Sequence, residues 1–395
     1  MHTMNICSEK RGLIAGICFG AAAVCLLMAL LGPARVWSLW CIPQQTPHFA
    51  DLRIVAGGAE SAAQGFDPLV QNPKDPWERP LNYPRIWTEL QHVGFDQSHV
   101  TITGVALVVL FILGLIIAVP KSDALGTAMV LAAVFSPAVM LGMERGNIDL
   151  LMFFMIAVSL ALFRKNETAS FIGIMLAFVM KIFPVFVMGV FLGSKNLRRW
   201  FITSLVVGGV YVALIACDLP LISAATLMGD TLSYGMNVLW NKAMSVNASV
   251  GTLVKYGSYL MVLLVGVFAI SASRSEFTEE PSTSLDAFRV GAAVYVGTFL
   301  LGNNWDYRLM FLIPAIPQLR YWSASSMVFV RRISKLMLLA LAMSLWHLPL
   351  DALLDLIPGG NYLGFALDEM ANWTLFGGLA WLLARGVFPV APSDT

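Results

Sequence analysis

The chain has 395 residues, of which 58% are hydrophobic and only 12% are charged, and its formal net charge is +1. A soluble domain carries about 25% charged residues, so this composition excludes an ordinary soluble protein and predicts an all-α, polytopic transmembrane helical bundle. No basic run is present, which argues against nucleic acid as a partner.

Apolar segments follow one another along the chain and predict one membrane domain over 1–395. This domain is expected to contact membrane lipids. The ranges of the apolar segments are 12–31, 100–119, 123–142, 148–163, 168–193, 200–217, 249–272, 288–302, 309–321, 335–350 and 373–388. Lys10 and Arg11 precede the first segment, which exceeds the roughly 7–15 apolar residues of a signal peptide. We therefore expect a retained membrane anchor.

The segment 32–99 is expected to form a long first external loop. Its stretch DLRIVAGGAESAAQG is helix-permissive and mildly amphipathic, which predicts an interfacial helix along the membrane surface. The following DPWERPLNYPR is broken by proline and predicts an irregular crossing. Asp51 opens the helix, where a carboxylate either complements the helix dipole or acts as a general base on an acceptor hydroxyl.

The segment 168–193 breaks the alternation of the other spans. Basic residues at 164–165 and 195–199 flank it on both sides, and Lys and Arg favour the cytoplasm. The segment also holds Lys181 in its middle and Pro184 shortly after, and proline breaks an interior helix. We predict two short helices that enter from the cytoplasm, turn near Lys181–Pro184 and return.

With that hairpin, the opposite face collects the polar stretches of the chain. They are 32–99, 143–149, Lys181, 218–248, 302–309 and 351–372. In MERGNIDL, Asn147 is a good N-cap and Asp149 suits the first helical turn, with Arg145 four residues before it as a possible ion-pair partner. Capping leaves Glu144 unexplained.

Arg145, Lys181 and Arg308 lie on this face beside a helix N-terminus and form a candidate anion site for a lipid phosphate. In NNWDYRL, Asp306 and Arg308 are two residues apart and would point different ways on a helix. Trp305 and Tyr307 are typical of an interfacial aromatic belt, so a belt and a site both remain open there.

Other motifs are missing. The histidines have no HExxH spacing and the chain has no DxD, so we expect no metal site. The cysteines show no CxxC pattern, and a disulfide between Cys41 and Cys217 stays open. The stretch 273–284 is expected to be a solvated cytoplasmic linker.

Four stretches together resemble the GT-C superfamily of membrane glycosyltransferases, specifically its polyprenyl-phosphate-mannose-dependent α-mannosyltransferase family. They are HFADLRIVAGGAESAAQGFDPL (48–69) with LNYPRIW (81–87), MERGNIDLLMFFMIAVSLALFRK (143–165), GIMLAFVMKIFPVFVMGVFLGSKNLRRW (173–200) and NNWDYRLMFLIPAIP (303–317). The resemblance implies a GT-C-like bundle with Asp51 as catalytic base. Many relatives read Gly-Gln-x-Asn where this chain has Glu144-Arg145-Gly146-Asn147, so only the Gly/Asn framework is shared.

The resemblance further implies an inverting transfer of a sugar, expected to be mannose, from a polyprenyl-phosphate donor to a glycolipid or glycan acceptor. The lipid-linked donor is a substrate, and no cofactor is expected. The residues expected to bind donor phosphate or substrate are Arg145, Asn147, Lys181, Arg308, Glu144, Asp306 and Tyr83. The enzyme would be a multi-pass protein of the inner membrane, with its active site facing the periplasm or exterior.

Two other classes of protein compete with this interpretation. A transporter or flippase for an anionic lipid or solute also has broken helices and intramembrane charges, but inverted repeats are not visible here. A membrane scaffold without chemistry would leave Lys181 unexplained, because a lysine inside an apolar run is costly.

Overall fold

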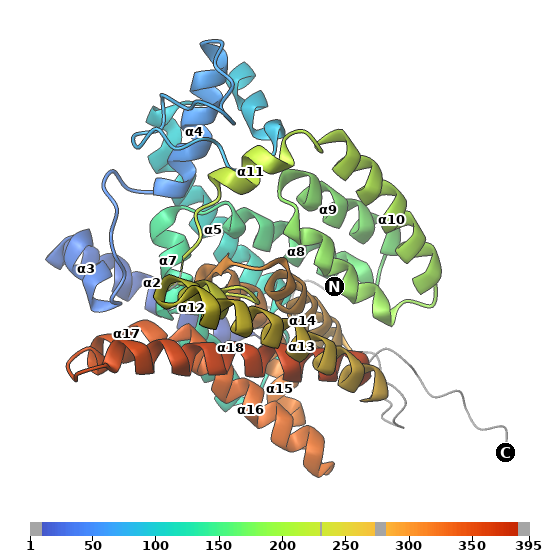
Figure 1. Ribbon diagram of the computed structural model, residues 1–395. Coiled ribbons are helices and arrows are strands. Elements are labelled where there is room, and N and C mark those ends of the chain that lie inside the picture. Colours follow the sequence, from blue (N-terminus) through green and yellow to red (C-terminus); the bar gives the residue numbers. More distant parts are fainter. Residues whose placement is uncertain (1–9, 230, 273–281, 386–395) are drawn as a thin grey trace.

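The computed structural model describes residues 10–229, 231–272 and 282–385, and the protein is helical along most of them (Figure 1). The α-helices are α2 (Arg11–Leu31), α3 (Pro33–Leu39), α4 (Ala50–Ala63), α5 (Val100–Ala118), α6 (Ala124–Val134), α7 (Pro137–Arg145), α8 (Asp149–Phe163), α9 (Glu167–Met180), α10 (Leu197–Leu214), α11 (Leu219–Ala225), α12 (Val238–Val246), α13 (Ala248–Ala272), α14 (Thr283–Leu301), α15 (Ile316–Trp322), α16 (Val328–Leu345), α17 (His347–Leu354) and α18 (Gly360–Arg385). The 3-10 helices are η1 (Arg85–Val93), η2 (Gln97–His99), η3 (Phe183–Gly193) and η4 (Asp306–Ala315). One small antiparallel sheet pairs β1 (Ser233–Tyr234) with β2 (Asn304–Trp305). The predicted all-α fold is confirmed.

Five of the described helices are long and apolar enough to cross a membrane, namely α2, α5 counted from Gln97, α10, α13 and α14. Two bent pairs raise this number to as many as seven: α6 with α7, bent by 43°, and α16 with α17, bent by 65°. Apolar side chains on α2, α10 and α13 are widely exposed, as expected of helices that face lipid. The chain is therefore a multi-pass membrane protein.

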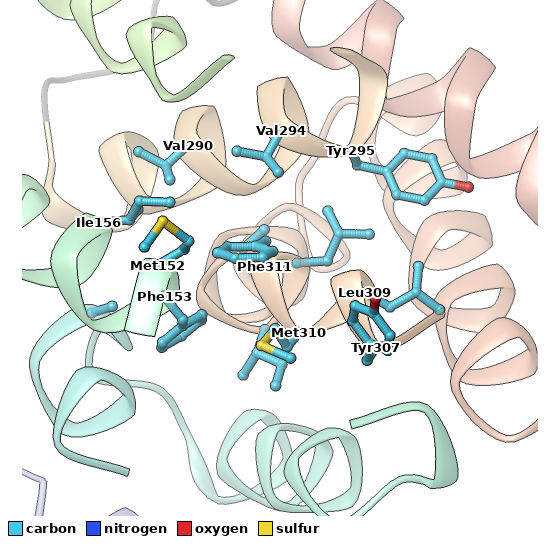
Figure 2. Close-up of a cluster of buried hydrophobic side chains, with 14 of the residues drawn as sticks. Met152, Phe153, Ile156, Val290, Val294, Tyr295, Tyr307, Leu309, Met310 and Phe311 are labelled. Atoms are coloured by element: carbon cyan, nitrogen blue, oxygen red, sulfur yellow. The ribbon is translucent and has the colours of Figure 1, made fainter. Parts of the chain in front are cut away.

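The core forms where η4 lies between α8 and α14 (Figure 2). The ring of Phe311 in η4 contacts those of Phe153 in α8 and Phe183 in η3, with centroids 5.7 and 5.2 Å apart. Nearly all of η4 is buried in protein, so the predicted span 309–321 does not form one lipid-facing helix. Pro314 and Pro317 lack the backbone N–H that a continuous α-helix needs at this point.

The predicted hairpin in 168–193 is confirmed as two antiparallel arms. Phe171, near the start of α9, lies 6.4 Å from Phe191, near the end of η3, between ring centroids. Both rings also pack on Trp200 of α10, each with its centroid 5.1 Å away. Because the two ends of the segment meet, the chain turns back at Lys181 and Ile182 instead of crossing.

The turn of this hairpin exposes backbone groups that need hydrogen bonds inside an apolar bundle. Two aromatic side chains supply them. The indole of Trp87 in η1 donates to the carbonyl oxygen of Met180 over 2.9 Å, and the hydroxyl of Tyr211 in α10 donates to that of Val179 over 2.6 Å. The segment 32–99 is thus tied to the broken helix by the side chain of Trp87.

Three expectations for the external pieces need correction or addition. Most of α4 is buried under the rest of 32–99, because Gly57 allows the backbone of Asp75 to approach too closely for any Cβ. The predicted helix forms, and its position along the membrane surface stays a prediction. The expected loop 351–372 is largely helical, since α18 already begins at Gly360. The loop 218–248 contains α11 and α12.

Two further expectations concern cysteines and the linker. Cys41 and Cys217 are both free thiols, so they do not form a disulfide. Most of the expected linker 273–284 lies outside the described residues.

The antiparallel arms of the hairpin generate a topology prediction. Reporter fusions after residues 165 and 197 should report the same side of the membrane, because the segment between them returns to its starting level. A fusion after residue 60 should report the opposite side. Opposite readings at 165 and 197 would contradict the hairpin and imply a single crossing.

Candidate functional site

Segments far apart in the sequence meet at one cavity of about 480 Å³, which the segment 32–99 helps to line. The residues that line it are Gln45, Asp51, Ile54, Leu69, Val70, Arg79, Pro80, Asn82, Tyr83, Arg145, Asn147, Lys181, Leu221, Ala224, Ala225, Thr226, Leu227, Trp305, Tyr307 and Arg308. In Figure 1 this is the end of the bundle where α4 and α11 lie. The cavity brings together six of the eight residues predicted from the sequence as site residues; Glu144 and Asp306 do not line it.

Asp51 owes its position to the residue two places before it. Phe49 adopts a left-handed backbone conformation (φ 60°) and starts α4. Its side chain lies against Gly146 and Gly104, where an added Cβ would come within 2.9 and 2.6 Å of Phe49 atoms. Gly146 itself has φ 58° and ends α7, a role that glycine fills without steric cost. Through Phe49, the start of α4 packs on α5 and on Gly146 at the end of α7, and this contact positions Asp51.

Asn147 connects this carboxylate to the hairpin. Its amide nitrogen donates to Oδ2 of Asp51 over 2.6 Å. Its amide oxygen accepts from the backbone N–H of Asp149 over 2.8 Å and from Nζ of Lys181 over 3.3 Å. The predicted capping role is confirmed, and the same side chain also links two groups that line the cavity.

Asp149 is the central counter-ion of the site. The sequence did not indicate this role, because a position in the first helical turn already explained the residue. Its fully buried carboxylate lies 2.6 Å from Nζ of Lys181 and 3.0 Å from Nε of Arg308. Arg308 also donates to Oδ1 of Asn304. Both cations lie over the ring of Phe183, at 5.9 and 4.8 Å from its centroid, which adds a cation–π attraction.

Arg145 is paired with its neighbour Glu144 and not with Asp149. The reversal at Gly146 ends α7, so Arg145 and Asp149 do not share one helix face. Arg145 also donates to the carbonyl oxygen of Pro43 over 3.0 Å, and Glu144 accepts from the backbone N–H of Gln45 over 2.9 Å. Glu144 therefore holds the loop before α4 and orients Arg145 from behind the cavity wall.

Arg79 is a fourth cation of the wall that the sequence did not reveal. It forms an ion pair with the buried carboxylate of Asp75 at 2.8 Å and donates to the carbonyl oxygen of Ala50 over 2.6 Å. The proline-rich stretch around it carries no motif that signals a site. Among the described residues that line the cavity, Asp51 is the one carboxylate, because the partners of the cations lie behind them.

Asp306 does not reach this cavity. Its carboxylate turns the other way and lies 3.4 Å from Nε2 of His347 in α17. The separation from Arg308 follows from their spacing of two residues, as expected from the sequence. The predicted substrate role of Asp306 therefore has no support from its position.

Burial changes the acid–base character of two groups in the segment 32–99, Asp51 and Tyr83. Removal from water raises the pKa of Asp51, and the hydrogen bond from Asn147 and the charges of Arg145, Arg79 and Lys181 partly offset this. A carboxylate with a raised pKa is a better general base near neutral pH. Burial also raises the pKa of Tyr83 well above its ordinary value, so its phenol stays neutral.

Within the described parts of the chain, no group of three or more His, Cys, Asp and Glu is arranged to hold a metal ion.

Comparison with known proteins gives one match. Residues 88–302 match the model of a family described as Glycosyltransferase family 87. This range is more than half of the chain and includes Arg145, Asn147 and Lys181, whereas Asp51 and Arg308 lie outside it. No curated protein and no solved structure matches the chain.

The two ion pairs of Asp149 predict an asymmetric effect on stability. Asp149→Asn leaves two buried cations without their counter-ion, and breaking a buried pair in this way costs about 3–5 kcal/mol. Lys181→Met keeps the pair between Asp149 and Arg308, so it should lower the apparent melting temperature of the purified protein much less. Thermal unfolding of both variants in one detergent measures the difference.

Asp123→Asn is the control for this comparison, because it weakens an exposed pair with Arg320 while an amide can still cap α6. It should change the melting temperature little, since exposed pairs contribute about 0–1 kcal/mol. A loss in Asp149→Asn no larger than in Lys181→Met would contradict the central role of Asp149.

Proposed function

The chain belongs to glycosyltransferase family 87, and on this premise we propose that it transfers mannose from polyprenyl phosphate to a hydroxyl of a glycolipid or glycan acceptor. Family and fold together make it a membrane glycosyltransferase of the GT-C type. The donor, the sugar and the acceptor are the proposal. The transporter alternative loses support, because the matched family is one of glycosyltransferases.

One observation carries the proposal: a single carboxylate and four cations face the same cavity. In the proposed reaction Asp51 takes the proton of the acceptor hydroxyl, and the acceptor oxygen attacks the anomeric carbon. The bond from that carbon to the phosphate oxygen breaks, and its electron pair leaves with the polyprenyl phosphate. Attack opposite the leaving group inverts the anomeric centre.

The cations are proposed to stabilise the negative charge that develops on the departing phosphate. Lys181, Arg308 and Arg145 are held by buried carboxylates before any donor arrives, so little reorganisation is needed during the reaction. Stabilisation of developing charge by such fixed groups is usually the largest single contribution to catalysis. Asn147 positions both Asp51 and Lys181 and is proposed to set the distance between base and leaving group.

Apolar residues that line the cavity suit the lipid part of the donor. They are Leu69, Val70, lining residues of α11 and Leu227, which lies two residues after the end of α11. Leu227 is 62% exposed, as is appropriate for a group that meets a lipid chain. No cofactor is proposed, since the activated sugar carries its own leaving group.

The proposed location is the inner membrane, with the cavity facing the periplasm or exterior. The support is the hairpin: its turn reaches the cavity at Lys181, while the basic residues at 164–165 and 195–199 flank its other end. Clusters of Lys and Arg favour the cytoplasmic side, so the cavity would open on the opposite side.

Asp51→Asn tests the proposed base. The amide keeps the shape of the side chain but accepts no proton, so turnover should fall by about 10²–10⁴-fold while the protein accumulates normally in the membrane. The assay uses purified protein, radiolabelled polyprenyl-phosphate mannose and a membrane extract as acceptor. Asp67→Asn, in the same external segment but paired with the exposed Arg85, should keep wild-type turnover. Near-wild-type turnover of Asp51→Asn would refute the role.

The pH dependence of turnover should report the ionisation of Asp51. The reaction needs Asp51 ionised, so turnover falls as the pH drops through the pKa of Asp51. Because burial raises this pKa, the fall should occur above the value near 3.9 of an exposed aspartate. Asn147→Ala removes a hydrogen bond that stabilises the carboxylate, so its acidic limb should lie at higher pH than in wild type. If Asn147→Ala is slower at every pH but its acidic limb lies at the same pH as in wild type, Asn147 has only a structural role.

A further inference from the structure

Three aromatic residues on the cavity wall carry polar groups that the protein does not use. They are Tyr83, Trp305 and Tyr307, and they line the cavity together with Asp51 and Arg308. Tyr83 and Tyr307 are only 4% and 6% exposed. In the described parts of the chain, the hydroxyls of Tyr83 and Tyr307 and the indole N–H of Trp305 have no hydrogen-bond partner. The polar ends of these side chains are not enclosed in protein, so they can hydrogen-bond a ligand that enters the cavity.

Trp305 and Tyr307 are also aligned as a pair. Their rings are parallel within 2°, with centroids 6.4 Å apart. Trp305 is held by β2, opposite Ser233 of β1, and Tyr307 packs against Gly142, where a Cβ would lie 3.0 Å from that of Tyr307. Among the described residues, neither ring stacks on another aromatic ring or lies beneath a cation. Two parallel rings thus line the cavity, and in the described parts of the chain neither has a further aromatic or cationic partner.

The chemistry of these groups selects among possible ligands. A phosphate would be bound by the cations and has no apolar face for the rings. A polyprenyl chain has an apolar surface but offers no acceptor to an indole N–H or a phenol. A pyranose ring offers both, since one face presents C–H groups to the electron-rich face of an aromatic ring and its edge presents hydroxyls.

We propose that Trp305 and Tyr307 form a platform for the ring of the transferred sugar, with Tyr83 hydrogen-bonding one of its hydroxyls. This inference rests on the proposed function, because it concerns the sugar of the same donor. It also replaces the membrane-belt interpretation of Trp305 and Tyr307. Arg308 directly follows the platform in sequence and belongs to the proposed phosphate site, so the sugar would lie between its phosphate and Asp51.

The test compares two lipids that differ only in the sugar. Affinities of the full-length protein in lipid nanodiscs for polyprenyl-phosphate mannose and for polyprenyl phosphate are measured by competition with a fluorescent polyprenyl phosphate. Trp305→Leu removes an aromatic contact and Tyr83→Phe removes a hydrogen bond, so each should weaken binding of the mannosylated lipid about three- to tenfold. Binding of the sugar-free lipid should not change.

Trp346→Leu and Tyr362→Phe serve as matched controls, because these side chains are 39% and 63% exposed and lie outside the cavity. Both should bind the two lipids as the wild type does. Tyr83→Phe retains the ring, so it keeps the test valid if Trp305→Leu fails to fold.

Three results would overturn the platform. Equal weakening of both lipids would mean that the aromatic pair only supports the fold. Unchanged affinity for both, in a protein whose transfer depends on Asp51, would remove the platform and leave the proposed function intact. A wild-type protein that binds neither lipid would overturn the proposed donor and the platform with it.

Discussion

The buried carboxylate of Asp149 holds together the parts of this protein that matter for its chemistry. It pairs with Lys181 at the turn of the hairpin and with Arg308 at the start of η4. Two cations brought so close inside an apolar bundle would repel each other without a shared counter-ion. The depth of the hairpin, the placement of η4 and the charged wall of the cavity therefore depend on one side chain.

A second constraint comes from the backbone. Inside an apolar bundle, the carbonyl groups left open at a broken helix must find donors. Trp87 supplies one of them from the segment 32–99, and Phe49 in the same segment packs on α5 and α7. This segment is consequently part of the site and not an appendage. The same contacts that satisfy the broken helix bring Asp51 to the cations.

The residues that line the cavity fall into three chemical groups, in a way that fits a lipid-linked sugar. One group is cations backed by buried carboxylates, a second is apolar, and a third is aromatic with free polar groups. Phosphate, isoprenoid chain and sugar ring are the three parts of the proposed donor. The family match covers 88–302, so all three groups include residues from outside the matched range, among them Arg79, Leu69 and Trp305.

The sequence alone determined the class of protein, most of the helices and the hairpin. Composition and apolar length suffice for the first two, because a bilayer imposes them on each segment separately. Basic residues on both flanks of one segment, with Lys181 in its middle, indicated the hairpin. They also indicated which face the polar residues share, so six predicted site residues do line one cavity.

Only the tertiary structure decided which of those residues are partners. Arg145 pairs with Glu144 because Gly146 reverses the chain, and Asp306 turns to His347, which is far away in sequence. Asp149 had a sufficient local explanation as a first-turn residue, and Arg79 had no motif at all. Ion pairs and packing between distant segments depend on distances across the fold, and a local sequence pattern contains no information about those distances.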